Sequence, residues 1–292
     1  MRVAIIGSGV VGSATGKGLV SIGKHDVIFY DINSLALDRL RKAGYKTGNI
    51  WDIDLDEDVY FLCVSTPTSG GQIDLNFITA AFSNLAYQIR NKKNSGYFVI
   101  VVRSTVVPGT CRRLMLLFEE ISGKKAGKDF GICMNPEYLR EVSAEEDFAN
   151  PRIITIGALD ELSYEKTCNV FQNFNCEIVK LNSMEEAEIQ KYIHNCFNAV
   201  KISFFNEMRD HCRRIGIIDP DIIFQATSKS CEGCWNPSYG MKDLGPFGGA
   251  CLPKDTEAYE SWAKRVLGIS SVMIKAAIKY NQKMIMLNGN GH

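Results

Sequence analysis

One short segment, residues 248–255, places a thiol beside an ammonium and a carboxylate in the order Gly-Gly-Ala-Cys-Leu-Pro-Lys-Asp. A thiolate at Cys251 can add to a carbonyl carbon and hold it covalently until water releases an acid. Lys254, or a helix beginning nearby, could activate that thiol. The alternative is a buried, inert cysteine, which is the interpretation given to the nine other cysteines. The glycines before Cys251 and the Lys-Asp pair after it favour the reactive interpretation.

A glycine motif, Gly7-Ser8-Gly9-Val10-Val11-Gly12, follows a strand-like run at residues 3–6 and should open a helix. Glycines there let backbone N–H groups approach a pyrophosphate, whose charge the helix N-terminus favours. Asp31, nineteen residues beyond Gly12 at the end of a second predicted strand, can accept hydrogen bonds from both ribose hydroxyls. Because Asp31 would repel a 2′-phosphate and no arginine follows it closely, the pattern predicts NAD rather than NADP. The alternative is a glycine-rich turn without a ligand.

Together, these motifs predict an oxidation in which a cysteine holds the reacting carbon. A nicotinamide takes hydride from the bound carbon, and the thiolate retains the carbonyl so that a second hydride leaves before hydrolysis. Glu137 follows a predicted buried strand, where its carboxylate could orient or deprotonate water. The alternative for Glu137 is an acidic first turn of a helix, where a carboxylate interacts favourably with the macrodipole.

Three polar residues on a long predicted helix, Glu188, Lys191 and Asn195, are spaced three and four apart. They therefore share one face of that helix. Lys191 and Asn195 could donate two hydrogen bonds to a developing oxyanion, where preorganised donors accelerate acyl chemistry. The alternative is a solvated stripe of ion pairs.

The composition is that of an ordinary soluble globular protein. Hydrophobic residues make up 46% of 292 residues, which is enough to build two domains. Thirty-three basic residues balance thirty-three acidic ones, so nucleic acid and anionic membranes are not expected partners. No run approaches the ~20 apolar residues of a membrane span. The ten scattered cysteines are expected to be reduced, in a cytoplasmic protein.

Short β-branched runs alternate with helical patterns up to about residue 180, and helices follow. The predicted strands are residues 3–6, 27–30, 59–64, 98–102, 132–134 and 153–156. The predicted helices of the later part are residues 184–215 and segments starting near 220, 254 and 270, with irregular structure at 229–253. The prediction is an α/β fold, in which a Rossmann domain with a doubly wound parallel sheet (residues 1–182) precedes an all-α domain with one long helix (residues 183–292).

Polar segments follow two of the predicted strands, namely Ser65-Thr66-Pro67-Thr68 and Ser104-Thr105-Val106. The carboxyl ends of parallel strands face the ligand crevice, so both segments are candidates for cofactor contacts. Helix caps and turns are the alternative.

In these motifs and their order, the chain resembles the UDP-glucose/GDP-mannose dehydrogenase family across nearly its whole length. The matching pieces are Gly7 to Gly12 with Asp31, Thr66-Pro67-Thr68, Ser104-Thr105-Val106, the segment Asn135 to Glu141, Lys191-Tyr192 with Asn195, Asn206-Glu207, Asn236 to Gly240, and residues 248–255. The ordered set, ending in Gly-Gly-x-Cys-x-Pro-Lys-Asp, is highly specific.

The resemblance implies a four-electron oxidation of a nucleotide sugar's C6 alcohol to the uronic acid with two NAD, UDP-glucose being the first substrate to try. It implies that Cys251 forms a thiohemiacetal and then a thioester. Lys191 and Asn195 would stabilise the oxyanion, Asp255 would assist proton transfer, and Glu137 with Thr105 would position water. The implied cofactor contacts are Gly7, Ser8, Gly9, Val10, Val11, Gly12, Asp31, Thr66, Pro67, Thr68, Ser104, Thr105, Glu141 and Lys254. The implied substrate contacts are Glu137, Tyr138, Leu139, Lys191, Asn195, Trp235, Asn236, Ser238 and Gly248.

Two features depart from the family pattern. Only 37 residues follow Asp255, whereas family members continue into a second Rossmann-like domain that holds the nucleotide. Three explanations remain open: a partner supplies that surface, the substrate is smaller, or the nucleotide is held weakly. In addition, residues 229–235 replace an Arg-Ile-Gly stretch, and residues 241–245 look inserted. Cys231 and Cys234 have metal or redox spacing, but a single pair without histidines is a weak signal, and no metal is predicted.

Two other functions remain open. A two-electron dehydrogenase of the 6-phosphogluconate or 3-hydroxy-acid type shares this architecture without needing a thiol. A non-catalytic module that binds NAD and a partner is the second alternative. For the enzyme, a homodimer through the long helix is expected.

Overall fold

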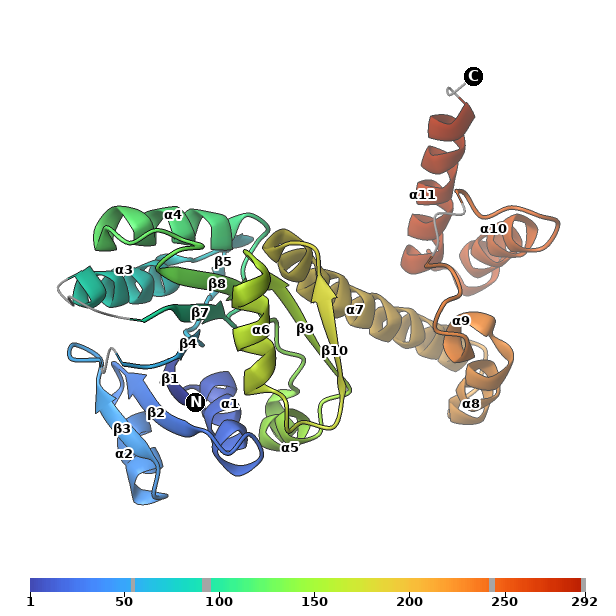
Figure 1. Ribbon diagram of the computed structural model, residues 1–292. Coiled ribbons are helices and arrows are strands. Elements are labelled where there is room, and N and C mark those ends of the chain that lie inside the picture. The colour runs from blue at the N-terminus through green and yellow to red at the C-terminus, as the bar shows by residue number, and fades with distance from the viewer. Residues whose placement is uncertain (54–55, 91–95, 242–244, 290–292) are drawn as a thin grey trace. The chain divides into compact units, whose positions relative to one another are not determined.

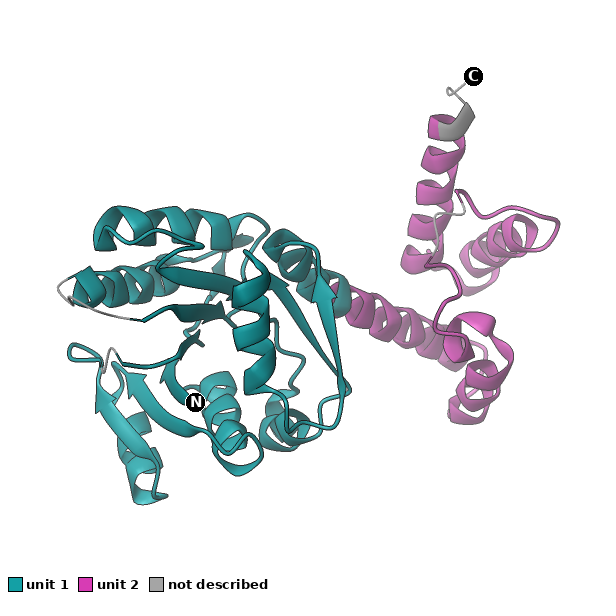
Figure 2. Cartoon of the chain, in the orientation of Figure 1, with its two compact units in different colours: residues 1–194 teal, residues 195–292 magenta. Residues whose placement is uncertain are grey.

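The computed structural model describes residues 1–53, 56–90, 96–241 and 245–289. It divides into two units, residues 1–194 and 195–292 (Figure 2). The unit boundary falls inside the long helix, whereas the sequence places the domain boundary at 182/183. Residues 242–244, the middle of the predicted insertion, lie outside the described part of the chain.

The first unit is built on an eight-stranded, mostly parallel sheet in the order β10-β9-β8-β7-β4-β1-β2-β3 (Figure 1). Its strands are β1 (Arg2–Ile6), β2 (Asp26–Asp31), β3 (Lys46–Asn49), β4 (Val59–Leu62), β7 (Phe98–Val102), β8 (Phe130–Met134), β9 (Ile153–Ala158) and β10 (Glu177–Leu181). The short strands β5 (Thr68–Ser69) and β6 (Gln72–Ile73) form a separate hairpin. β9 is antiparallel to β8 and parallel to β10, and the other pairings in the sheet are parallel.

Helices cover both faces of this sheet. They are α1 (Val10–Ser21), α2 (Ser34–Lys42), α3 (Asn76–Arg90), α4 (Thr110–Ser122), the 3-10 turn η1 (Glu141–Ser143), α5 (Ala144–Ala149) and α6 (Glu161–Val170). The long helix α7 (Met184–Arg214) follows the last strand. In the second unit come α8 (Asp221–Ser230), α9 (Glu232–Trp235), α10 (Leu252–Trp262), the π-helical turn η2 (Ala263–Leu267) and α11 (Val272–Gly289).

Alternate side chains of each central strand enter two different cores. Val3 and Ile5 of β1 join one cluster with residues of α1, α2 and α5, whereas Ala4 and Ile6 join the other with residues of α3, α4 and the start of α7. Figure 1 shows α3 and α4 on one side of the sheet and α1 and α5 on the other. Strands buried on both faces read as continuous apolar runs, which is why the central strands are visible in the sequence. The predicted α/β doubly wound fold is confirmed.

The sequence analysis missed the short hairpin β5–β6 and the two edge strands of the main sheet. β3 has the sequence Lys-Thr-Gly-Asn and β10 the sequence Glu-Ile-Val-Lys-Leu, and neither contains a buried residue. An edge strand needs apolar residues on at most one face, so its pattern is weak.

The regular secondary structure of the second unit is all helical in the part of the chain that the structure describes. α7 ends one residue before the predicted end, and α10 begins at Leu252 rather than near 254. The expectation of irregular structure at 229–253 is wrong at both ends, because α8 runs to Ser230 and α10 begins at Leu252. It is also wrong at α9, a four-residue helix that no periodic pattern can signal. Contacts between helices hold this unit together, among them the hydrogen bond His211 Nδ1–Tyr259 Oη (2.9 Å) and the bond from Met273 N–H to Glu207 Oε2 (3.0 Å). No described helix has both the length and the apolar character needed to span a bilayer.

Candidate active site

The glycine motif forms a tight turn at the carboxyl end of β1. Gly7 has φ +96°, and a Cβ there would lie 2.8 Å from the carbonyl of Cys63. A Cβ on Gly12 would lie 1.8 Å from the carbonyl oxygen of Gly7, so neither position accepts another residue without movement. Gly9 is the N-cap of α1 without a capping side chain, and a Cβ there would meet nothing within 4 Å. The helix N-terminus is therefore open to a pyrophosphate, as NAD binding requires.

Asp31, the last residue of β2, is held beside this turn. Its Oδ2 accepts the N–H of Ser8 at 2.5 Å, and its Oδ1 accepts the N–H of Asn33 at 2.8 Å. Each carboxylate oxygen has a second acceptor site, so both remain able to accept a ribose hydroxyl. The residues present at this edge of the sheet thus fit the adenosine half of NAD.

Hydrogen bonds join the polar segment after β4 to the polar segment after the neighbouring strand β7. Thr66 Oγ1 donates to the carbonyl of Thr105 at 2.8 Å, and Ser104 Oγ donates to the carbonyl of Val64 at 2.6 Å. The structure therefore brings Thr66, Ser104 and Thr105 together near the switch point between β1 and β4, where doubly wound sheets bind ligands. Thr68 lies in β5 and Glu141 in η1, and both are exposed.

Glu137 and Lys191 form a buried ion pair. Lys191 Nζ donates to Glu137 Oε1 at 2.9 Å and to the carbonyl oxygen of Glu137 at 2.5 Å, while the Leu139 N–H donates to Oε2. The two side chains are only 6% and 14% exposed. An ammonium has three donors, so Lys191 keeps one for another acceptor. The pair lies where β8 ends and where α7 passes it.

A chain of polar contacts supports this pair. Arg103 Nη1 donates to Asn135 Oδ1 at 2.5 Å, and Asn135 Nδ2 donates to the carbonyl of Thr155 at 2.8 Å. The hydroxyls of Thr155 and Tyr138 lie 2.6 Å apart, and Tyr138 also donates to Gln190 Oε1. Burial raises the pKa of Tyr138, so its hydroxyl stays protonated and available as a donor.

Sequence reasoning missed Arg103, which is 5% exposed and whose Nε has no partner among the described residues. Its guanidinium lies 5.1 Å from the ring centre of Phe148. Burial lowers the pKa of Arg103, although neighbouring Cys63 and Glu137 oppose that effect. The sequence did contain a signal for Arg103, because it directly follows five apolar residues of a buried strand. A charged residue is rarely buried at such a position unless it has a partner or a role.

Glu188 is fully buried, and its carboxylate accepts the N–H groups of Gly109 (2.5 Å) and Cys111 (2.7 Å) at the start of α4. The alternative of a solvated ion-pair stripe is therefore wrong for Glu188 and Lys191, which both face the first unit. Asn195, four residues beyond Lys191, is exposed.

Cys251 lies in the second unit, as the exposed N-cap of α10. Pro253 occupies the first turn, and Gly249 has φ +77°, so the chain turns sharply before the thiol. A thiolate at a helix N-terminus is stabilised by the helix dipole. Lys254 Nζ lies 2.5 Å from Asp255 Oδ1, and both side chains are largely exposed, so these two charges pair with each other.

The predicted substrate segment of the second unit is a structured turn. Asn236 Oδ1 accepts the N–H (3.1 Å) and the hydroxyl (2.8 Å) of Ser238, and Asn236 Nδ2 donates to Glu232 Oε1. Trp235 is 58% exposed. A Cβ on Gly248 would meet no atom within 4 Å. These residues are therefore accessible to a ligand.

The other cysteines differ in exposure. Burial raises the pKa of Cys63 and of Cys133 to about 12, and it raises the pKa of Cys111 strongly as well. The expectation of a buried, inert thiol is thus correct for these three. It is wrong for Cys196 and Cys231, which are exposed. Within the described residues, no group of three or more histidine, cysteine or acidic side chains could hold a metal ion.

The candidate residues therefore fall into two sets. The first unit brings together the glycine turn, Asp31, the polar strand ends and the Glu137–Lys191 pair. The second unit carries Cys251, Lys254, Asp255 and the turn around Asn236.

Comparisons with known proteins match both units. Residues 51–175 match the NAD-binding domain of the UDP-glucose/GDP-mannose dehydrogenase family, and residues 185–283 match its central domain. GDP-mannose 6-dehydrogenase of Pseudomonas aeruginosa is 32% identical, and UDP-glucose 6-dehydrogenase AglM of Haloferax volcanii is 33% identical. These matches cover 98% and 96% of this chain, respectively, and 69% of each relative.

Solved structures agree with these matches. A ternary complex of GDP-mannose dehydrogenase from Pseudomonas aeruginosa superimposes with TM-score 0.88 at 30% identity, over 98% of this chain and 69% of that one. A UDP-glucose dehydrogenase from Pyrobaculum islandicum gives TM-score 0.69 at 31% identity, over 97% and 68% of the two chains.

Proposed function

The chain belongs to the UDP-glucose/GDP-mannose dehydrogenase family, and from this membership we propose that it oxidises the C6 alcohol of a nucleotide sugar to the uronic acid, with two NAD consumed per sugar. The observation that carries the proposal is the exposed thiol of Cys251 at the N-terminus of α10, three residues before Lys254 and four before Asp255. A two-electron dehydrogenase has no use for such a thiol.

Cys251 acts as the nucleophile. Its sulfur adds to the C6 aldehyde to form a thiohemiacetal, the second oxidation converts this adduct to a thioester, and water releases the acid. Asp255, one turn along α10, assists proton transfer. Covalent attachment keeps the aldehyde on the protein between the two oxidations.

Lys191 and Asn195 stabilise the negative oxygen of the adduct. Lys191 is preorganised for this role, because two of its donors are fixed on Glu137 and the third remains. Glu137 and Thr105 position the water that attacks the thioester. Trp235, Asn236, Ser238 and Gly248 contact the sugar nucleotide, together with Tyr138 and Leu139 beside Glu137.

The glycine turn, Asp31 and the polar segments after β4 and β7 hold NAD, with Glu141 and Lys254 contributing further contacts. NAD supplies the hydride acceptor for each of the two oxidations. The residues of the chain bind and orient this cofactor.

Two nucleotide sugars are the first to test. The sequence predicts UDP-glucose, and AglM, a relative with 33% identity, is a UDP-glucose 6-dehydrogenase. GDP-mannose is the second candidate, because the GDP-mannose dehydrogenase complex has the higher TM-score of the two structures compared.

A homodimer through α7 is part of this proposal. Ile193, Phe197 and Val200 recur at helical spacing along α7 and are 62%, 57% and 52% exposed. Apolar residues in such a row favour burial against a second helix. Light scattering at micromolar concentration should give the mass of two chains, and the mass of one chain would refute the dimer.

The decisive experiment counts NADH formed per nucleotide sugar and repeats the count with Cys251→Ser. We expect two NADH per sugar, and turnover that stalls in the variant. Cys196→Ser, which removes another exposed thiol of the same unit, is the matched control and should retain activity. One NADH per sugar with an active Cys251→Ser enzyme would support the two-electron alternative. NAD binding by calorimetry without NADH from any nucleotide sugar would support the non-catalytic module.

A further inference from the structure

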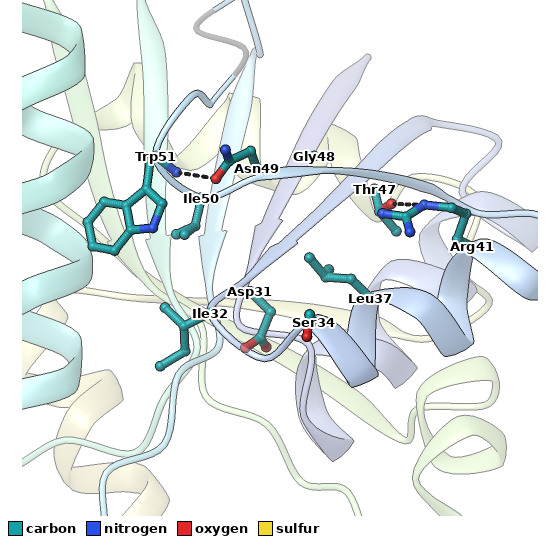
Figure 3. Close-up of a pocket in the computed structure, with 10 residues that line it drawn as sticks. All are labelled: Asp31, Ile32, Ser34, Leu37, Arg41, Thr47, Gly48, Asn49, Ile50 and Trp51. Carbon is teal, nitrogen blue, oxygen red and sulfur yellow. Dashed lines mark hydrogen bonds between the residues drawn. The ribbon is translucent and has the colours of Figure 1, made fainter.

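A pocket of about 460 Å³ lies between α2, the end of β2, and β3 with the loop that follows it (Figure 3). This volume is within the range of about 300 to 1,000 Å³ that small-molecule sites occupy. Its lining residues differ in character from one end to the other. Figure 3 shows Trp51 and Ile32 at one end, Asp31 and Ser34 in the middle, and Arg41 with Thr47 at the other end.

The apolar end of this pocket is unusually exposed. Trp51 is 71% exposed and Ile32 is 75% exposed, and each follows closely on the last residue of a strand. An exposed indole costs free energy in water, because its apolar surface favours burial. A single exposed apolar residue needs no explanation, but two that line one pocket beside a cofactor carboxylate indicate a ligand with a flat apolar face.

The backbone around Trp51 is anchored on both sides. The Trp51 N–H donates to Asn49 Oδ1 at 3.0 Å. The carbonyl of Ile50 accepts bonds from two side chains of α3, Asn84 Nδ2 at 2.7 Å and Gln88 Nε2 at 3.1 Å. The Ile53 N–H donates to Gln88 Oε1 at 2.7 Å.

These bonds fix the backbone of the loop, whereas the side chain of Trp51 in that loop remains largely in solvent. Ordering a side chain and its loop costs conformational entropy, so the anchoring presents a preorganised surface for binding.

At the opposite end of the pocket, the charge of Arg41 is already compensated by Asp38. Arg41 Nη1 donates to Asp38 Oδ1 at 2.6 Å, and Arg41 Nε donates to Thr47 Oγ1 at 3.2 Å. Asp31, in the middle, carries the carboxylate that fits a ribose. A ribose held on Asp31 directs the attached base along the pocket. The apolar face of a base therefore matches the end of the pocket with Trp51 and Ile32, and not the end with Arg41.

We propose that Trp51 stacks on the adenine ring of NAD, with Ile32 as the second apolar contact. The nicotinamide must lie at the reacting end of the cofactor, near the ends of β4 and β7, so adenosine is the half that reaches β2 and β3. Every base has a π-face, and stacking on an aromatic side chain is a general mode of base recognition. The inference depends on NAD binding by this family and is independent of which sugar is oxidised.

The test measures binding in the absence of any sugar, so its outcome is separate from that of the proposed oxidation. In Trp51→Ala we expect Kd for NAD and for ADP-ribose to rise about tenfold, within the roughly five- to 150-fold range of base–aromatic stacking. Trp51→Phe should restore most of the affinity. Binding of nicotinamide mononucleotide, which lacks adenine, should be unchanged. Tyr87→Ala removes a 62% exposed aromatic side chain of α3 outside the pocket, and should leave every Kd unchanged.

A fluorescence measurement tests the same proposal if Trp51→Ala folds poorly. Of the three tryptophans, Trp235 and Trp262 can be replaced by phenylalanine so that Trp51 is the only source of tryptophan fluorescence. Saturation with ADP-ribose should quench and shift this emission, whereas nicotinamide mononucleotide should not. Unchanged emission at saturation, or a wild-type Kd for ADP-ribose in a folded Trp51→Ala protein, would overturn the proposal.

Discussion

The ammonium of Lys191, on α7, donates to both the main-chain carbonyl and the carboxylate of Glu137, in the loop after β8. The Lys191 side chain thus holds both the backbone and the carboxylate of Glu137 in place. The contact joins the end of the sheet to the helix that continues into the second unit. Because Lys191 is buried and the side chain of Glu137 is only 14% exposed, each charge depends on the other for compensation.

The first prediction concerns removal of one charge of this pair. Lys191→Met or Glu137→Gln should lower the free energy of unfolding by about 3 to 5 kcal/mol, because each leaves a buried charge unpaired. The double variant should lose less free energy of unfolding than the sum of the two single losses. Urea unfolding followed by circular dichroism measures this coupling. Additive losses would show that the two groups do not stabilise each other.

The second prediction concerns Glu188. Its carboxylate accepts two backbone N–H groups at the start of α4, so Glu188→Ala should leave both donors buried without partners and lower the free energy of unfolding by about 3 kcal/mol. Glu188→Gln keeps one acceptor oxygen and should cost less. Glu120→Ala, which removes an exposed acidic side chain of α4, is the control, with an expected change within about 0.5 kcal/mol. Equal losses in Glu188→Ala and Glu188→Gln would contradict this role.

The fold was predictable where burial dictates the residue types. Strands such as β4 and β7 are buried on both faces, so Val59 to Leu62 and Phe98 to Val102 are continuous apolar runs. α7 was predictable because 31 residues contain no helix-breaking proline or glycine. The edge strands β3 and β10 were missed because half-exposed strands accept polar residues.

The site was predictable to the extent that motifs are local in sequence. The turn from Gly7 to Gly12 and the thiol of Cys251 are each visible in a few consecutive residues. Arg103 was missed because its partners, Asn135 and Phe148, are distant in sequence and only the folded sheet brings them together. The role of Glu188 was not predicted for the same reason, because it accepts backbone N–H groups of α4 that only the fold brings to it.

The third prediction concerns the reactivity of the thiols. Alkylation requires the thiolate, and burial raises the pKa of Cys63 and of Cys133 to about 12, so at pH 8 these thiols remain protonated and inaccessible. Iodoacetamide at pH 8 should therefore modify Cys251 and the other exposed cysteines first, as mass spectrometry of peptides can show. A nucleotide sugar should protect Cys251 selectively. Early modification of Cys63 in the folded protein would contradict the burial described above.

The fourth prediction concerns acid stability near η1. Hydrogen bonds from the Arg140 side chain and backbone, and from Ser143, hold the pKa of Asp147 well below its usual value of about 3.9. A carboxyl whose pKa is depressed in the folded state contributes stability at pH values above its unfolded pKa and loses that contribution as the pH falls toward the folded pKa.

Asp147→Asn cannot ionise, so it should lack this contribution. The wild type should therefore be more stable than Asp147→Asn at pH 7, and the difference should shrink below about pH 4. Urea unfolding at a series of pH values from 7 to 3 measures the difference. Arg140→Gln, which removes the side-chain donor and leaves the carboxylate, should reproduce part of the loss at pH 7 and restore the pKa of Asp147 toward its usual value. A stability difference that is constant from pH 7 to pH 3 would show that Asp147 titrates alike in the folded and unfolded chains.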